Sequence, residues 1–198
     1  WTVTGTDTGA ISVGNAFAFT DFQSLIGGTG ADDFVFDNGG IVTGVIAGGT
    51  GTDTLDYDTG TFTGGATIVL SALGAGSATD TGGFTGIEAV IGGAGQTNSL
   101  TGNNATNTWT VTGTDTGAIS VGNAFAFIDF QSLIGGTGAD NFTISGGDVT
   151  NGVDGGTGSD TLTSDNGGNT FTITGPDSGT LSGMTAGWTA IENLTGGT

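Results

Sequence analysis

Four short glycine-rich turns contain the residues of this chain that are best suited to chemistry. Each has the pattern Gly-Gly-Thr-Gly-x-Asp, then one further residue and an apolar residue. Glycines permit tight backbone turns, and a carboxylate beside backbone carbonyls can hold a hard cation such as Ca²⁺. The turns therefore predict cation binding. They span residues 27–34, 48–55, 135–142 and 155–162.

These turns resemble the nonapeptide of the RTX (repeats-in-toxin) family, Gly-Gly-x-Gly-x-Asp-x-U-x, where U is a large apolar residue. In that family the turn binds Ca²⁺ through backbone carbonyls and the carboxylate, and U begins a strand. The copies here are single rather than tandem, and the turn at 92–100 lacks the aspartate, so no site is expected there. The resemblance implies the carboxylate ligands Asp32, Asp53, Asp140 and Asp160, in turns that begin at Gly27, Gly48, Gly135 and Gly155.

The spacing of the aspartates predicts how they pair. Asp53 follows Asp32, and Asp160 follows Asp140, by about 20 residues, the size of one solenoid coil. Each pair could meet across adjacent coils and hold one Ca²⁺ between them. The alternative is that these aspartates only form turn hydrogen bonds that fix a sharp corner.

Composition excludes several classes of function. The chain has 19 acidic residues and no Lys, Arg or His, which gives a formal net charge of −19. It therefore has no basic patch for nucleic acid or anionic lipid, and no His or Lys for catalysis. Asp56 and Asp58 could suggest a glycosidase pair, but no aromatic cleft accompanies them. We expect no enzyme, and the partner that the charge favours is a cation.

Short alternating runs of apolar residues predict strands. Examples are Trp1-x-Val3, Ile11-x-Val13 and Phe34-x-Phe36, bounded by Gly, Asn and Asp. No window has a sustained helical period, and no run approaches the ~20 apolar residues of a membrane span. The chain has no Cys, hence no disulfide. Outside the glycine turns, Asp7, Asp115 and Asp177 are expected to be solvated turn residues.

Internal repetition sets the predicted architecture. Residues 1–34 recur as residues 109–142 with two differences, Thr20 against Ile128 and Asp33 against Asn141. Double glycines begin at residues 27, 92, 135 and 196, and the intervals between them divide into units of about 20 to 22 residues. The prediction is an all-β fold, a parallel β-solenoid of about nine coils. It forms one segment, 1–198, with repeat units of about 1–57, 58–108, 109–165 and 166–198.

The repeats favour a structural function. The segments between the glycine turns resemble modules of large bacterial surface proteins and adhesins. The expectation is a segment of a secreted or cell-surface bacterial protein, part of an adhesin, filament or matrix, stiffened by Ca²⁺ outside the cell. Its expected partners are calcium, further copies of itself and a host-surface or matrix glycan, with no nucleic acid and no membrane insertion.

Three alternatives remain open from the sequence. The first is a self-assembling surface-layer or filament subunit without bound calcium. The second is an ice-binding solenoid, which Thr-x-Thr runs such as Thr110-Val-Thr112 would suggest, although Thr is common in strands generally. The third is a polysaccharide-active β-helix enzyme.

Overall fold

The computed structural model describes residues 1–121 and 123–197, and in that part of the chain every regular element is a β-strand. The all-β prediction is therefore confirmed. The chain forms two compact units, Trp1–Asn98 (unit 1) and Ser99–Thr198 (unit 2). No helix among the described residues is long and apolar enough to cross a membrane.

Unit 1 contains two sheets. The strand order of its first sheet is β11-β7-β5-β1-β2-β3, and that of its second sheet is β8-β9-β10-β6-β4. The first sheet contains β1 (Thr2–Gly5), β2 (Thr8–Val13), β3 (Asn15–Thr20), β5 (Asp33–Phe36), β7 (Thr54–Asp56) and β11 (Ala89–Ile91). The second contains β4 (Leu25–Gly28), β6 (Ile46–Gly49), β8 (Thr67–Ala72), β9 (Ala75–Ala78) and β10 (Phe84–Thr85).

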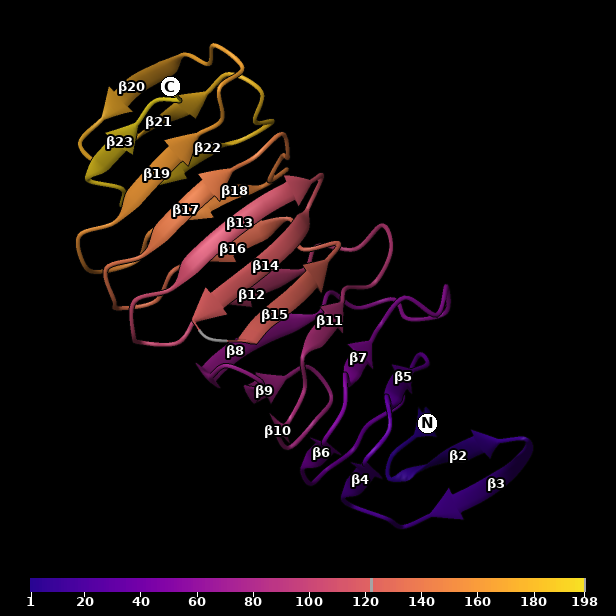
Figure 1. Ribbon diagram of the computed structural model, residues 1–198. Coiled ribbons are helices and arrows are strands. Elements are labelled where there is room, and N and C mark those ends of the chain that lie inside the picture. Colours follow the sequence, from indigo (N-terminus) through magenta and orange to yellow (C-terminus); the bar gives the residue numbers. More distant parts are fainter. Residues whose placement is uncertain (122, 198) are drawn as a thin grey trace. The chain divides into compact units, whose positions relative to one another are not determined.

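Unit 2 repeats this plan with one additional strand. Its first sheet has the order β23-β19-β17-β13-β14-β15, and its second has β20-β21-β22-β18-β16-β12. Figure 1 shows the two sheets of unit 2 as separate layers. The first contains β13 (Thr108–Gly113), β14 (Thr116–Val121), β15 (Asn123–Ile128), β17 (Asn141–Ile144), β19 (Thr161–Ser164) and β23 (Asn193–Thr195). The second contains β12 (Ser99–Thr101), β16 (Ser132–Ile134), β18 (Gly152–Asp154), β20 (Phe171–Gly175), β21 (Ser178–Leu181) and β22 (Gly187–Thr189).

The chain passes back and forth between the two sheets, and successive strands of one sheet pair in parallel. In unit 1, Phe34 of β5 lies opposite Leu55 of β7. In unit 2, Phe142 of β17 lies opposite Leu162 of β19. The spacing predicted from the glycine turns is therefore present between these strands.

Four three-stranded antiparallel meanders interrupt that spacing. They are β1-β2-β3, β8-β9-β10, β13-β14-β15 and β20-β21-β22. Because a meander adds two strands to one sheet before the chain crosses, the parallel partners around it are further apart in the sequence. Val3 pairs with Phe36, and Phe84 pairs with Ile46, both well beyond the length of one predicted coil. The predicted division into coils of uniform size does not describe these regions.

Asp7 and Asp115 are not solvated, contrary to the expectation from sequence. Each occupies the first turn of a meander with a positive φ of 53°. Asp7 is 7% exposed and Asp115 is 6% exposed. Asp177, at the corresponding turn before β21, has a φ of 48° and is exposed as expected.

Alternate side chains of both sheets form the core. Phe36 stacks on Tyr57 with ring centroids 4.9 Å apart, and Trp109 stacks on Phe142 at 5.2 Å. All four of these rings are fully buried. Burial of one such side chain is worth about 1.5–3 kcal/mol. The stacks explain why aromatic residues recur at strand positions that pair in register.

Candidate cation-binding turns

In each Gly-Gly-Thr-Gly-x-Asp turn, the carboxylate folds back over the first glycine. A Cβ on Gly27 would lie 2.6 Å from Oδ2 of Asp32, and a Cβ on Gly48 would lie 2.6 Å from Oδ2 of Asp53. The turns at Gly135 and Gly155 have the same arrangement with Asp140 and Asp160. Only glycine leaves room for the carboxylate at this position.

A backbone carbonyl of a neighbouring chain segment packs against the same side of the first glycine. A Cβ on Gly27 would also overlap the carbonyl oxygen of Gly48, and one on Gly48 would overlap that of Gly86. Each aspartate Oδ2 therefore lies close to the carbonyl of the next turn along the stack. Both oxygens pack against the glycine, where only a hydrogen atom fits between them.

The predicted pairs lie on neighbouring turns. Oδ1 of Asp53 accepts the backbone N–H of Asp32 at 2.8 Å. Oδ1 of Asp160 accepts the backbone N–H of Asp140 at 2.7 Å. The structure thus brings Asp32 to Asp53 and Asp140 to Asp160, and it gives one oxygen of the later aspartate a structural role.

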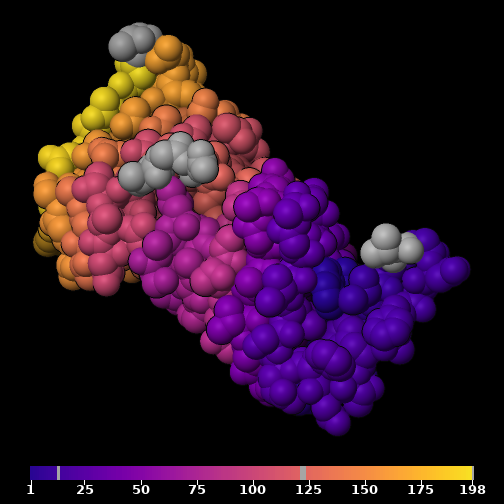
Figure 2. All heavy atoms as spheres, turned by 60° about the horizontal axis from the view of Figure 1, so that its bottom comes forward, coloured from indigo at the N-terminus to yellow at the C-terminus, as the bar shows by residue number. Residues whose placement is uncertain are grey.

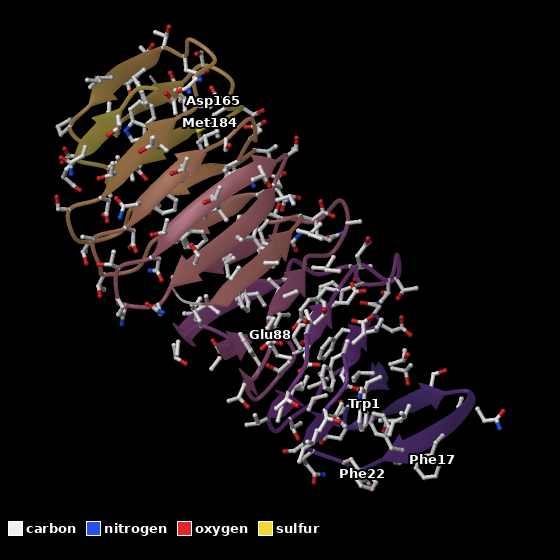
Figure 3. The ribbon with its side chains drawn as sticks, in the orientation of Figure 1. Trp1, Phe17, Phe22, Glu88, Asp165 and Met184 are labelled. Atoms are coloured by element: carbon white, nitrogen blue, oxygen red, sulfur yellow. The ribbon has the colours of Figure 1, made fainter. Side chains whose placement is uncertain are left out.

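Sequence reasoning missed two further acids that bind the backbone of these aspartates, Glu88 and Glu192. Oε2 of Glu88 accepts the backbone N–H of Asp53 at 2.8 Å, and Oε2 of Glu192 accepts that of Asp160 at 2.7 Å. The available signal was an Ile-Glu pair just before β11 and again before β23. Figure 3 labels Glu88 in unit 1.

The second carboxylate oxygen has no partner in three of the four turns. Asp53, Asp140 and Asp160 are fully buried, whereas Asp32 is half-buried. Oδ2 of each buried aspartate makes no hydrogen bond to any described residue. Burial raises the pKa of the Asp140 and Asp160 carboxyls above their usual range. An unpartnered buried carboxylate oxygen is costly, so these atoms require a ligand or a proton.

Asn107 shows what surrounds this oxygen. It ends the turn at 102–107, and a Cβ on Gly102 would lie 2.8 Å from its Nδ2, so the amide nitrogen replaces Oδ2. Nδ2 donates to the carbonyls of Asn103 and Ala105, both at 2.9 Å, and to that of Gly135 at 3.3 Å. Nδ2 also donates to Oδ1 of Asp140 at 2.7 Å. Carbonyl and carboxylate oxygens therefore converge on this atom, and in the aspartate turns the equivalent atom is itself an oxygen.

Three other carboxylates of the chain already have hydrogen-bond partners on both oxygens. Oδ1 of Asp7 accepts the Thr43 backbone N–H at 2.8 Å, and its Oδ2 accepts the Thr43 hydroxyl at 2.7 Å. Asp115 binds Thr150 in the same way, as Asp148 binds Thr185. These acids need no further ligand. The turn at 92–98 is also satisfied, because Asn98 accepts the N–H of Ala66 and donates to the carbonyl of Gly93.

The donor set of the glycine turns fits Ca²⁺ in one particular way. Among the described residues, no three acidic side chains gather round one point. Oδ1 of Asp53, Asp140 and Asp160 already accepts a backbone N–H, so an ion at Oδ2 would take one oxygen of that carboxylate, with backbone carbonyls and water as its other ligands. Calcium accepts six to eight such oxygens in flexible geometry. Asp53, Asp140 and Asp160 would hold it with the glycine carbonyls around them.

No protein-family profile, no curated protein and no solved structure matches this chain. The RTX resemblance rests on the four turn sequences.

Proposed function

We propose that this chain is a structural repeat segment of a secreted or cell-surface bacterial protein, a β-solenoid whose Gly-Asp turns bind Ca²⁺. One observation carries the proposal. Asp53, Asp140 and Asp160 each bury an unpartnered carboxylate oxygen among carbonyls, in a chain without a cationic side chain. A divalent cation offsets that charge and completes the coordination of oxygens that otherwise repel.

Calcium suits this site better than the other common hard cation. Mg²⁺ demands nearly ideal octahedral geometry and retains its waters, whereas Ca²⁺ tolerates irregular sets of carbonyls. Extracellular calcium modules bind in the range of roughly 10⁻⁴ to 10⁻³ M. A site with one carboxylate belongs at that weak end, which favours use outside the cell.

The parallel pairing of strands that follow one another within the same sheet supports the solenoid. β5 and β7 pair in parallel, as do β17 and β19, with the glycine turns at their entry. Calcium at a turn would join two neighbouring crossings and stiffen the stack. Further copies of the chain and a matrix glycan are the macromolecular partners that we propose.

The direct test is calcium titration of calcium-stripped protein. We expect saturable binding by calorimetry and a higher unfolding midpoint, because an ion that binds only the folded chain stabilises it by mass action. Asp53→Ala should remove binding in unit 1 and leave unit 2 unchanged. Absence of binding, together with a circular dichroism spectrum that EGTA does not alter, would support the calcium-free filament subunit instead.

A second candidate function has one observation in its favour. In unit 2 the outward threonines Thr110, Thr143, Thr163 and Thr195 lie opposite one another on β13, β17, β19 and β23. Two positions earlier on each strand, the outward residues are Thr108, Asn141, Thr161 and Asn193. Rows ~4.8 Å apart form a regular array of hydroxyl and methyl groups, the kind of surface that orders water and binds ice.

Thermal hysteresis tests the ice-binding candidate. Thr143→Lys, in the middle of the array, should abolish hysteresis, whereas Thr85→Lys, at an exposed position of β10 in unit 1, should leave it unchanged. Freezing behaviour equal to that of a buffer control would exclude this function and leave the structural proposal in place.

A further inference from the structure

The two copies of the long repeat, 1–34 and 109–142, differ in what covers them. Phe17 of β3 is 68% exposed, whereas the matching Phe125 of β15 is 1% exposed. Phe22 is 59% exposed, and the matching Phe130 is fully buried. Figure 3 labels Phe17 and Phe22 beside the β2–β3 hairpin, and in Figure 2 the indigo atoms of the N-terminal segment lie at the surface of unit 1. Since the sequences match, the difference comes from the surroundings.

The strands that follow, β4 and β16, show a matching difference within each unit. Both lie in the identical sequence Gln-Ser-Leu-Ile-Gly-Gly-Thr-Gly. β16 lies between β18 and β12, so both of its edges are paired. β4 pairs with β6 and has no second partner among the described strands of unit 1. Its outward residue Ile26 is 68% exposed, whereas the matching Ile134 is half-buried.

We infer that the free edge of β4 binds a parallel strand with the sequence of residues 99–108, Ser-Leu-Thr-Gly-Asn-Asn-Ala-Thr-Asn-Thr, supplied by a further repeat placed upstream. Unit 2 already contains this complex, because β12 pairs with β16 through Leu100 opposite Leu133 and Thr101 opposite Ile134. On β4 the same strand would place its Leu on Leu25 and its Thr beside Ile26. This is β-strand addition to an exposed sheet edge.

The turn that follows β12 strengthens the assignment. Gly102 donates its N–H to the carbonyl of Ile134 at 2.8 Å, and the backbone N–H of Asn107 donates to Oδ1 of Asp140 at 2.7 Å. The counterparts in unit 1 are Ile26 and Asp32, which are exposed and half-buried respectively. An incoming strand would therefore meet hydrogen-bonding groups as well as an apolar surface.

The occupant is identified by where its sequence lies in the chain. Residues 99–108 directly precede Trp109, which begins the second repeat. A segment of that sequence ahead of Trp1 would reach β4 by the same short path. The inference rests on the proposed stacking of repeats, but it requires no calcium.

A fusion protein tests the inference. Residues 91–108 are appended directly before Trp1, and the control fusion has Asp in place of the appended copy of Leu100. Hydrogen exchange at residues 24–28 should be at least tenfold slower in the first fusion than in the control, and its unfolding midpoint should be higher. Ile26→Glu should remove the difference, whereas Val45→Glu, at another exposed apolar residue of unit 1, should keep it.

Each remaining outcome counts against the inference. Equal exchange and equal midpoints in the two fusions would show that β4 does not accept this strand. If the unfused chain dimerises with rising concentration and Ile26→Glu disperses the dimer, the occupant is a second copy and the assignment to an upstream segment is wrong. All measurements are made with calcium and with EGTA, so a failure of calcium binding leaves this result readable.

Discussion

At the residue scale, one atom distinguishes the turns. Asn107 places an amide nitrogen among carbonyl oxygens, where Asp53, Asp140 and Asp160 place an unpartnered oxygen. The resemblance to RTX turns singled out these aspartates from sequence, and the structure adds why the position matters. The oxygens around this atom come from neighbouring turns. The spacing of residues in the sequence does not fix the positions of those turns accurately enough to predict the cluster.

We expect Asp160→Asn to stabilise the calcium-free chain at neutral pH. The amide would donate to the surrounding carbonyls as Asn107 does, and relief of one unsatisfied buried group is worth about 1–3 kcal/mol. The same variant should lose part of the stabilisation that calcium confers. Urea unfolding measures both effects, and Asp177→Asn, an exposed acid with the same change in charge, is the control. Destabilisation of Asp160→Asn without calcium would contradict the role assigned to Oδ2.

Acidification should stabilise the calcium-free chain. Because burial raises the folded-state pKa of Asp140 and Asp160, the folded chain binds more protons than the unfolded one above about pH 4. Stability therefore falls as pH rises through the raised values and recovers as pH falls toward about 4. Unfolding midpoints between pH 4 and pH 8 in EGTA measure this slope. Burial also raises the pKa of Asp33, Asp56 and Asp80, so the double variant Asp140→Asn/Asp160→Asn should reduce the slope without removing it. An unchanged slope would assign it to those other acids.

At the scale of elements, strand positions were predictable and meanders were not. Alternating apolar residues mark β1, β5 and β13 correctly as strands. The same alternation continues through β2 and β3, so it does not distinguish a hairpin from the next crossing. The deciding feature is the positive φ of Asp7 and Asp115, which Asp tolerates better than most residues. Glu88 and Glu192 were missed for the same reason. Each follows a meander, and the length of that meander decides which backbone N–H its carboxylate reaches.

The meander turns should be sensitive to loss of their aspartate. Asp115→Ala would remove the acceptor of the Thr150 N–H and hydroxyl and would place a less tolerant residue at positive φ. We expect a loss of about 2–4 kcal/mol, from hydrogen bonds to a charged group and from backbone strain. Asp177→Ala, at the exposed turn, should cost less than half of that. Equal losses in urea unfolding would show that Asp115 acts through φ alone.

At the scale of the whole molecule, charge decides the conditions under which the chain is stable. Nineteen acidic residues repel one another, and no cationic side chain offsets them. Sodium chloride should therefore raise the unfolding midpoint by screening. Calcium chloride at the same ionic strength should raise it further, because it also binds the turns. Identical midpoints in the two salts would reduce calcium to a screening ion.

The regular offset between parallel strands defines the length of chain that can be inserted or deleted without disturbing their pairing. Asp33 lies opposite Thr54, so removal of residues 33–53 would join Asp32 to the residue that occupies the same register one crossing later. The shortened chain would keep the paired strands in register, although Asp7 would lose its partner Thr43. Removal of a single residue would instead turn a strand's apolar face outward. Gene lineages that carry this fold can therefore change its length by one whole crossing at a time, and repeat arrays with lengths that differ by that step would share one architecture.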